Sequence, residues 1–106
     1  MSVRYGTVAM TGLNDASKIL KRADEHPRLW DAFADAKAAL VVRAEMLRDH
    51  LDSSHCNYRM RSESGDHRYV VSIEYGPSSP DEDLPFRTVF HVYAQAAHSS
   101  NWRAQQ

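Results

Sequence analysis

The sequence is poor in cysteine and in long apolar runs, and both deficits bear on where the protein works. Its 106 residues include one cysteine, Cys56, which has no partner for a disulfide within the chain, so a reducing interior is the simpler setting. No stretch approaches the ~20 apolar residues of a membrane span. The first residues, Met1–Gly6, lack the apolar run of a signal peptide. We therefore expect a cytoplasmic protein that makes no contact with a membrane.

The sequence also lacks an excess of charge of either sign. Thirteen Lys and Arg residues against fourteen Asp and Glu residues give a formal net charge of -1. This balance argues against a protein whose whole body condenses on a polyphosphate, although it leaves room for a local basic patch. A chain of this length forms one domain, which we place at 1–97 and follow with a flexible tail over 98–106.

Glycine and proline are absent from the interior of one long segment, Pro27–Asp52, which spans twenty-six residues. Apolar residues recur there at helical spacing, so the segment predicts a helix that begins at Pro27, where the missing N–H costs nothing. A shorter pattern predicts an earlier helix, Asp15–Glu25, with Asn14 as its N-cap. The apolar stripes are Ala16, Ile19, Leu20 and Ala23 in the first helix, and Trp30, Phe33, Leu40, Ala44, Leu47 and Leu51 in the second.

Alternation of apolar and polar residues predicts four strands, the first at an edge of the sheet. A turn at Ser64–Asp66 joins two of them, with Gly65 at positive φ. We therefore expect an α+β fold of two layers, in which two N-terminal helices pack on a small antiparallel sheet in the order strand, helix, helix and three strands. The strands are Val3–Met10, Asn57–Glu63, His67–Tyr75 and Phe86–Ala96. The expected core residues are Trp30, Phe33, Leu40, Leu47, Tyr69, Val71, Ile73, Phe90 and Val92.

One face of the predicted sheet gathers basic and aromatic side chains that could bind RNA. Guanidinium groups contact a phosphate backbone, and rings stack on bases. The alternative is an ordinary solvated face, because Glu63 and Glu74 share the region. The outer-face candidates are Arg59, Arg61, Arg68, Arg87, His91 and Tyr93.

The predicted element order resembles that of the RelE-type ribosome-dependent mRNA-cleaving toxins, although those toxins are typically strongly basic. The resemblance covers most of the chain and is one of element order, without a matched motif. It implies that groups on the outer sheet face neutralise transition-state charge and transfer protons. These groups would be Arg61, Arg68, Arg87, His91 and Tyr93.

Two further surfaces could bind a protein. Three adjacent carboxylates, Asp81, Glu82 and Asp83, could mimic nucleic-acid phosphate, could dock on a basic partner or could simply keep a loop tip soluble. On the second predicted helix, the apolar residues Val41, Val42 and Met46 widen the apolar surface beyond one stripe. We expect either the first helix or a second copy of the chain to cover them, and a second copy would make a homodimer.

Complete constellations for metal binding or catalysis are missing. His50, His55, Cys56 and His67 are close in sequence, but no pair has the spacing of a strong zinc site. We therefore predict no metal, no cofactor and no catalytic residues. The leading hypothesis is a small cytoplasmic non-enzymatic module that occupies a surface of a larger macromolecule, as accessory inhibitors of phages and mobile elements do. A protein partner is favoured over RNA, and the mRNA-cleaving toxin is the alternative.

Overall fold

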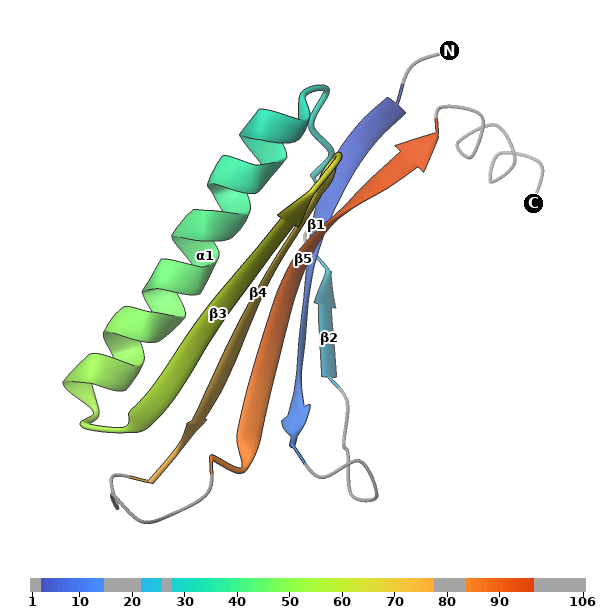
Figure 1. Ribbon diagram of the computed structural model, residues 1–106. Coiled ribbons are helices and arrows are strands. Elements are labelled where there is room, and N and C mark those ends of the chain that lie inside the picture. Colours follow the sequence, from blue (N-terminus) through green and yellow to red (C-terminus); the bar gives the residue numbers. More distant parts are fainter. Residues whose placement is uncertain (1–2, 15–21, 26–27, 78–83, 97–106) are drawn as a thin grey trace.

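In the computed structural model, residues 3–14, 22–25, 28–77 and 84–96 are described, and within them the fold is mostly β with one helix (Figure 1). The sheet has the strand order β2-β1-β5-β4-β3, and every neighbouring pair is antiparallel. The elements are β1 (Val3–Leu13), β2 (Arg22–Glu25), α1 (Phe33–Ser53), β3 (Asn57–Gly65), β4 (Arg68–Gly76) and β5 (Phe86–Ala96).

The prediction of two N-terminal helices is wrong. Of the segment expected to form the first helix, residues 15–21 lie outside the described ranges, and Arg22–Glu25 forms strand β2 beside β1. A short segment with apolar residues at mixed spacing fits either structure locally. The hydrogen-bonding edge that β1 offers favours the strand, because tertiary pairing overrides weak helical propensity.

Strand β1 is not at the edge of the sheet, as the sequence predicted. It pairs with β5 from Val3↔Ala96 to Leu13↔Phe86, and with β2 on its other side. Beyond β2, Tyr5 and Trp30 exchange two backbone hydrogen bonds of 2.8 Å. The side of β1 that faces away from β5 is therefore partly closed by two separate pieces of the chain.

Helix α1 begins later than the glycine-free segment predicts. Pro27, the expected first residue, lies outside the described ranges, and Trp30 is in the bridge to Tyr5. The helix starts at Phe33 and ends at Ser53, one residue beyond the predicted end. Freedom from glycine and proline permits a helix, but the backbone bonds to β1 hold Trp30 in an extended conformation.

The core lies between α1 and one face of the sheet (Figure 1). Ala36 and Ala44 are fully buried on the helix, and their small side chains let its backbone approach the strands. Of the expected core residues, five are buried, namely Leu40, Val71, Ile73, Phe90 and Val92. The other four, Trp30, Phe33, Leu47 and Tyr69, are partly buried and pack against this cluster.

The turn between β3 and β4 differs from the prediction in the residue that takes positive φ. The two strands are joined by Asp66 and His67, and His67 has a φ of 56°. Gly65 instead pairs with Arg68 as the last residue of β3. In this left-handed conformation the ring of His67 lies near Tyr5 and Phe33, with centroid distances of 5.8 Å to each.

Candidate binding face

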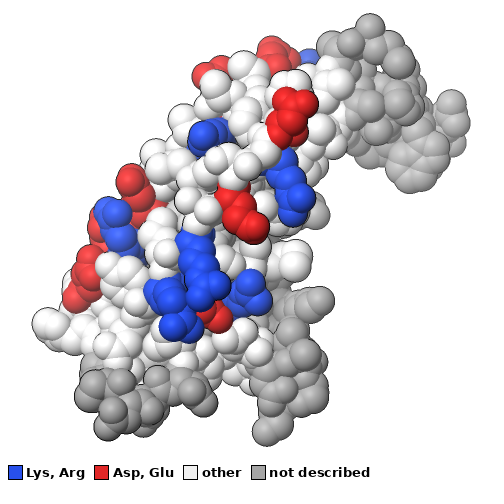
Figure 2. Space-filling view, viewed as in Figure 1, with Lys and Arg blue, Asp and Glu red and all other residues white. Residues whose placement is uncertain are grey.

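The face of the sheet that α1 does not cover carries alternating charged and apolar residues from β3, β4 and β5. Strand register places Arg59, Glu74 and Arg87 in one row across the three strands. The next row contains Arg61, Ser72 and Val89, and the third contains Glu63, Val70 and His91. Figure 2 shows basic side chains gathered over this part of the sheet, with acidic atoms among them. We call this surface the outer face.

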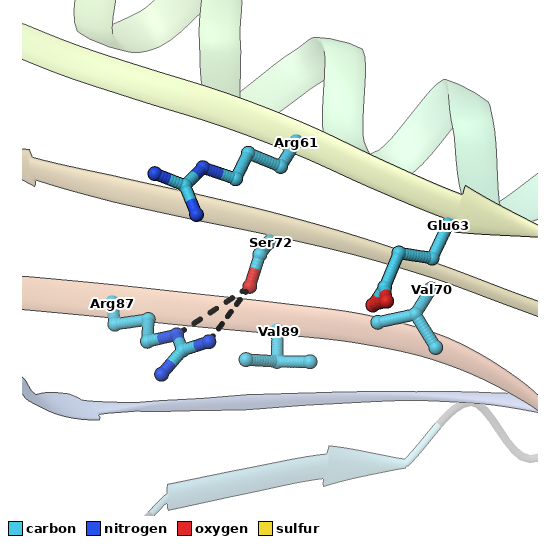
Figure 3. A pocket seen from close by; sticks show the side chains of 6 residues that line it. All are labelled: Arg61, Glu63, Val70, Ser72, Arg87 and Val89. Carbon is cyan, nitrogen blue, oxygen red and sulfur yellow. Dashed lines mark hydrogen bonds between the residues drawn. The ribbon is translucent and has the colours of Figure 1, made fainter.

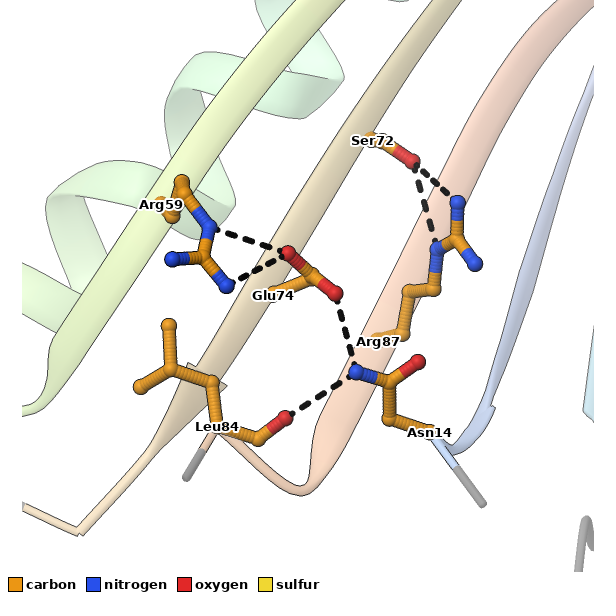
Figure 4. Close-up of polar contacts among 6 residues, drawn as sticks. All are labelled: Asn14, Arg59, Ser72, Glu74, Leu84 and Arg87. Carbon is orange, nitrogen blue, oxygen red and sulfur yellow. Dashed lines mark hydrogen bonds and ion pairs between the residues drawn. The ribbon is translucent and has the colours of Figure 1, made fainter. Parts of the chain in front are cut away.

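Glu74 is the centre of a structural network at one end of the outer face (Figure 4). Its Oε1 accepts a hydrogen bond of 3.1 Å from Arg59 Nε and lies 3.0 Å from Arg59 Nη2. Its Oε2 accepts a bond of 2.8 Å from Asn14 Nδ2, which also donates to the carbonyl of Leu84. Asn14, expected as a helix N-cap, therefore ties β1 to β4 and to the segment before β5.

The pKa of Glu74 lies below its ordinary value. Partial desolvation by itself raises this pKa, but the hydrogen bonds from Arg59 and Asn14, with the charges of Arg59 and Arg87, outweigh it. Glu74 is therefore a carboxylate near neutral pH, and it occupies the guanidinium of Arg59. Arg59 is consequently a poor candidate for binding a ligand.

Arg61 and Arg87 keep more of their hydrogen-bonding capacity. Arg87 donates from Nε and Nη2 to Ser72 Oγ at 3.4 and 3.3 Å. Among the described residues, Arg61 makes no hydrogen bond and no ion pair, and both arginines are exposed. A guanidinium has five N–H donors, so each of these side chains can still bind an anionic group.

A hollow of about 280 Å³ opens between these arginines on the outer face. Figure 3 shows the two guanidinium groups on either side of Ser72, and Glu63 beside Val70 toward the other end. Between the ends, the valine side chains provide apolar surface. The lining residues are Arg61, Glu63, Val70, Ser72, Arg87 and Val89. The hollow thus offers cationic donors at one end, a carboxylate at the other and an apolar floor.

Four of the predicted outer-face residues do not line this hollow, namely Arg59, which binds Glu74, and Arg68, His91 and Tyr93. The ring of Tyr93 lies on Gly6, where a Cβ atom would come within 2.5 Å of the ring and its hydroxyl oxygen. His91 is half-buried, and its pKa is lowered by desolvation and then by the charge of Arg68. Arg68 begins β4 and is exposed. The six residues predicted as one surface therefore divide between the Glu74 network, the hollow and the region around Tyr93.

The other two predicted surfaces have different outcomes. Asp81, Glu82 and Asp83 lie outside the described residues. On α1, Val42 is 55% exposed and Met46 is 66% exposed, whereas Val41 is half-buried. The prediction that an earlier helix covers them is wrong, because the part of that segment which the structure describes is β2. Cover by a second copy remains a prediction.

Within the described ranges, no three His, Cys, Asp or Glu side chains are placed to hold a metal ion. Cys56 is half-buried just before β3, whereas His67 follows the other end of that strand. The nine residues of β3 separate them by roughly 30 Å at the rise of a β-strand. The described part of the chain also contains no helix long and apolar enough to cross a membrane.

Four lining residues were not predicted as binding residues, namely Glu63, Val70, Ser72 and Val89. The pairing register of β3 and β4 could have predicted them. A two-residue turn at Asp66 and His67 would have placed Arg61 opposite Ser72 and Glu63 opposite Val70.

Comparisons with protein-family models, with curated proteins and with solved structures find no match for this chain. The chemistry of the outer face is therefore the basis on which a function can be proposed.

Proposed function

We propose that this protein is a small non-enzymatic binding module that holds a segment of a protein partner on its outer face. The observation that supports this proposal is the hollow, in which Arg61 and Arg87 stand at one end and Glu63 at the other. An acidic side chain of the partner would lie between the two guanidinium groups. Charge-assisted hydrogen bonds of this kind are stronger than neutral ones and fix orientation.

The rest of the hollow fits a polypeptide with mixed side chains. Val70 and Val89 give an aliphatic partner residue an apolar surface, and Glu63 can pair with a lysine or an arginine. Opposite charges at the two ends would set the direction in which the segment binds, since the reversed segment would place like charges together.

RNA fits the same surface less well. Single-stranded RNA is held by aromatic side chains on which bases stack, and none of the six lining residues is aromatic. Tyr93 is the aromatic residue that the sequence predicted for this face, and its ring packs on Gly6. Glu63 and Glu74 would also repel phosphates, and a net charge of -1 gives RNA no long-range attraction to the whole molecule.

Binding without catalysis is consistent with the chemistry of the lining. Ser72 accepts hydrogen bonds from Arg87, and the lining supplies no histidine, cysteine or lysine to activate it. The mRNA-cleaving toxin remains an alternative prediction, but His91 and Tyr93 do not line the hollow that contains Arg61 and Arg87. An accessory inhibitor of the phage or mobile-element type would need no more than a surface that occupies its target.

The test is affinity capture from native lysate with the wild type and with Arg61→Ala/Arg87→Ala. Arg48→Ala, on the helix, is the control for loss of a basic charge away from the outer face. We expect one protein to be captured by the wild type and the control. Each lost charge-assisted contact should weaken binding to the purified partner by about tenfold or more.

Equal capture by the double variant would overturn the proposal, and so would capture of RNA that is lost after nuclease treatment. A second measurement keeps the result interpretable. Circular dichroism should show that the double variant has the same melting temperature as the control, because both altered side chains are exposed.

A further inference from the structure

The outer edge of β3 is the longer of the two edges of the sheet. The opposite edge is β2, which has only four residues and lies beside β1 next to the bridge between Tyr5 and Trp30. On one side, β3 forms nine continuous pairs with β4 without a bulge. No described residue pairs with its other side. From Arg59 to Gly65 every residue of β3 is exposed, on both faces of the strand. Such an edge is a template for another strand.

The register shows which backbone groups of β3 face outward. Gly65 and Arg68 flank the two-residue turn, and a pair in this position is hydrogen-bonded. Hydrogen-bonded pairs alternate along an antiparallel ladder. The N–H and C=O groups that point away from β4 therefore belong to Tyr58, Met60, Ser62 and Ser64.

The charges on this edge are self-complementary. Charged residues on an edge strand usually discourage pairing, but here Arg61 and Glu63 have opposite signs and stand on either side of Ser62. If two copies of β3 pair antiparallel about Ser62, each Arg61 lies opposite the other copy's Glu63. The small Ser62 side chains meet at the twofold axis, where bulk would obstruct pairing.

We propose that β3 is a self-association edge, on which the occupant is β3 of a second copy, paired antiparallel with Ser62 at the twofold axis. The sheets of the two copies then form one continuous sheet, with both α1 helices on the same side. The competing register, centred on Arg61, places the two Arg61 side chains opposite each other. Like charges directly opposite destabilise a strand pair, so this register is disfavoured.

This inference does not require the proposed function, because it rests on the backbone edge of β3 and on the order of charges along that strand. Arg61 and Glu63 also line the hollow, so each would pair either with the second copy or with a segment of a partner. Pairing of one strand buries less area than the ~1,200 Å² of a standard interface, so the association should be weak.

The experiment is sedimentation equilibrium of the full chain from micromolar to about millimolar concentration. We expect a monomer–dimer equilibrium for the wild type. Arg61→Glu and Glu63→Arg should each weaken it by about tenfold, since each places two pairs of like charges opposite one another. The double exchange Arg61→Glu/Glu63→Arg should restore it. Glu45→Arg, on the exposed side of α1, changes the net charge as Glu63→Arg does and should leave association unchanged.

A backbone variant tests the edge without using charge. Ser62→Pro removes an N–H that points away from β4, so it should abolish association and preserve the ladder to β4. If this variant does not fold, the charge exchange still decides the question. A wild type that stays monomeric at every concentration would overturn the proposal. So would an association that survives both single reversals and is lost in Val42→Asp/Met46→Asp, because that result would assign the dimer to the helix face.

The two proposals can fail separately. Arg87→Ala should weaken partner capture and leave self-association unchanged. Ser62→Pro should abolish self-association and leave partner capture unchanged.

Discussion

The ring of Tyr93 fills the space that a side chain at position 6 would need. The two residues are cross-strand partners on β1 and β5, and glycine at position 6 leaves room for the ring. A Cβ atom there would lie 2.5 Å from the ring carbon Cζ and from the hydroxyl oxygen. The half-buried tyrosine therefore depends on the absence of a side chain on the neighbouring strand.

Gly6→Ala should destabilise the fold by about 1–3 kcal/mol, because the ring must move out of its packed position. In a Tyr93→Ala background the same change should be neutral or stabilising by about 0.5–1 kcal/mol, since alanine has less freedom to lose on folding. Urea denaturation of the four proteins in this cycle measures the coupling. Equal costs of Gly6→Ala in both backgrounds would show that the contact does not determine the choice of glycine.

Phe90→Ala should destabilise the protein by about 3–5 kcal/mol, as expected for a large-to-small change in a core. Phe90 is 5% exposed beneath α1. The matched control is Phe86→Ala on the same face of β5, where the ring is 40% exposed and stacks on Tyr75. The control should lose clearly less stability in chemical denaturation. Similar losses at both positions would contradict the placement of the core at the centre of β5.

Glu74 should contribute stability that depends on pH. Its pKa is lower in the folded protein than the ordinary pKa of a glutamate, so the contribution is present above the unfolded pKa and is lost as the pH falls through the folded pKa. Glu74→Gln should therefore cost about 1 kcal/mol near pH 7, a modest value because Arg59 is exposed to solvent. The difference between wild type and variant should shrink on acidification below about pH 4. A difference that does not vary with pH would exclude the ionic network as its source.

His91 should remain neutral to a lower pH than a solvated histidine. Desolvation and the nearby positive charge of Arg68 lower its pKa below 6.5, so the unfolded state binds a proton first and this residue's contribution to stability falls as the pH drops below 6.5. NMR titration of its ring protons gives the value directly. Arg68→Ala should raise the pKa of His91 part of the way back, whereas Arg48→Ala on the helix should leave it unchanged. A titration midpoint above 6.5 in the wild type would contradict the burial of this ring.

Several elements could be predicted because their pattern is local. Strand β5 has the predicted bounds, Phe86–Ala96, since alternation of large apolar and polar residues over eleven positions fits no helix. Strand β4 is displaced by one residue at each end, and Val71 and Ile73 face the core as predicted. The binding face could be predicted in part. Arg61 and Arg87 were identified from alternation, but the hollow between them depends on which strands are neighbours.

The sequence by itself determined the spacing of apolar residues in several segments. Apolar and polar residues alternate with a period of two in Arg68–Gly76 and Phe86–Ala96, and apolar residues recur at helical spacing through Leu40 and Leu51. These periods depend on side-chain directions that every residue has locally. Only the tertiary structure decided that Arg22–Glu25 is a strand and that Trp30 bonds to Tyr5. Both results follow because the backbone groups of β1 require hydrogen-bond partners. Which segment becomes the partner depends on its position in space, and a local sequence pattern contains no information about that position.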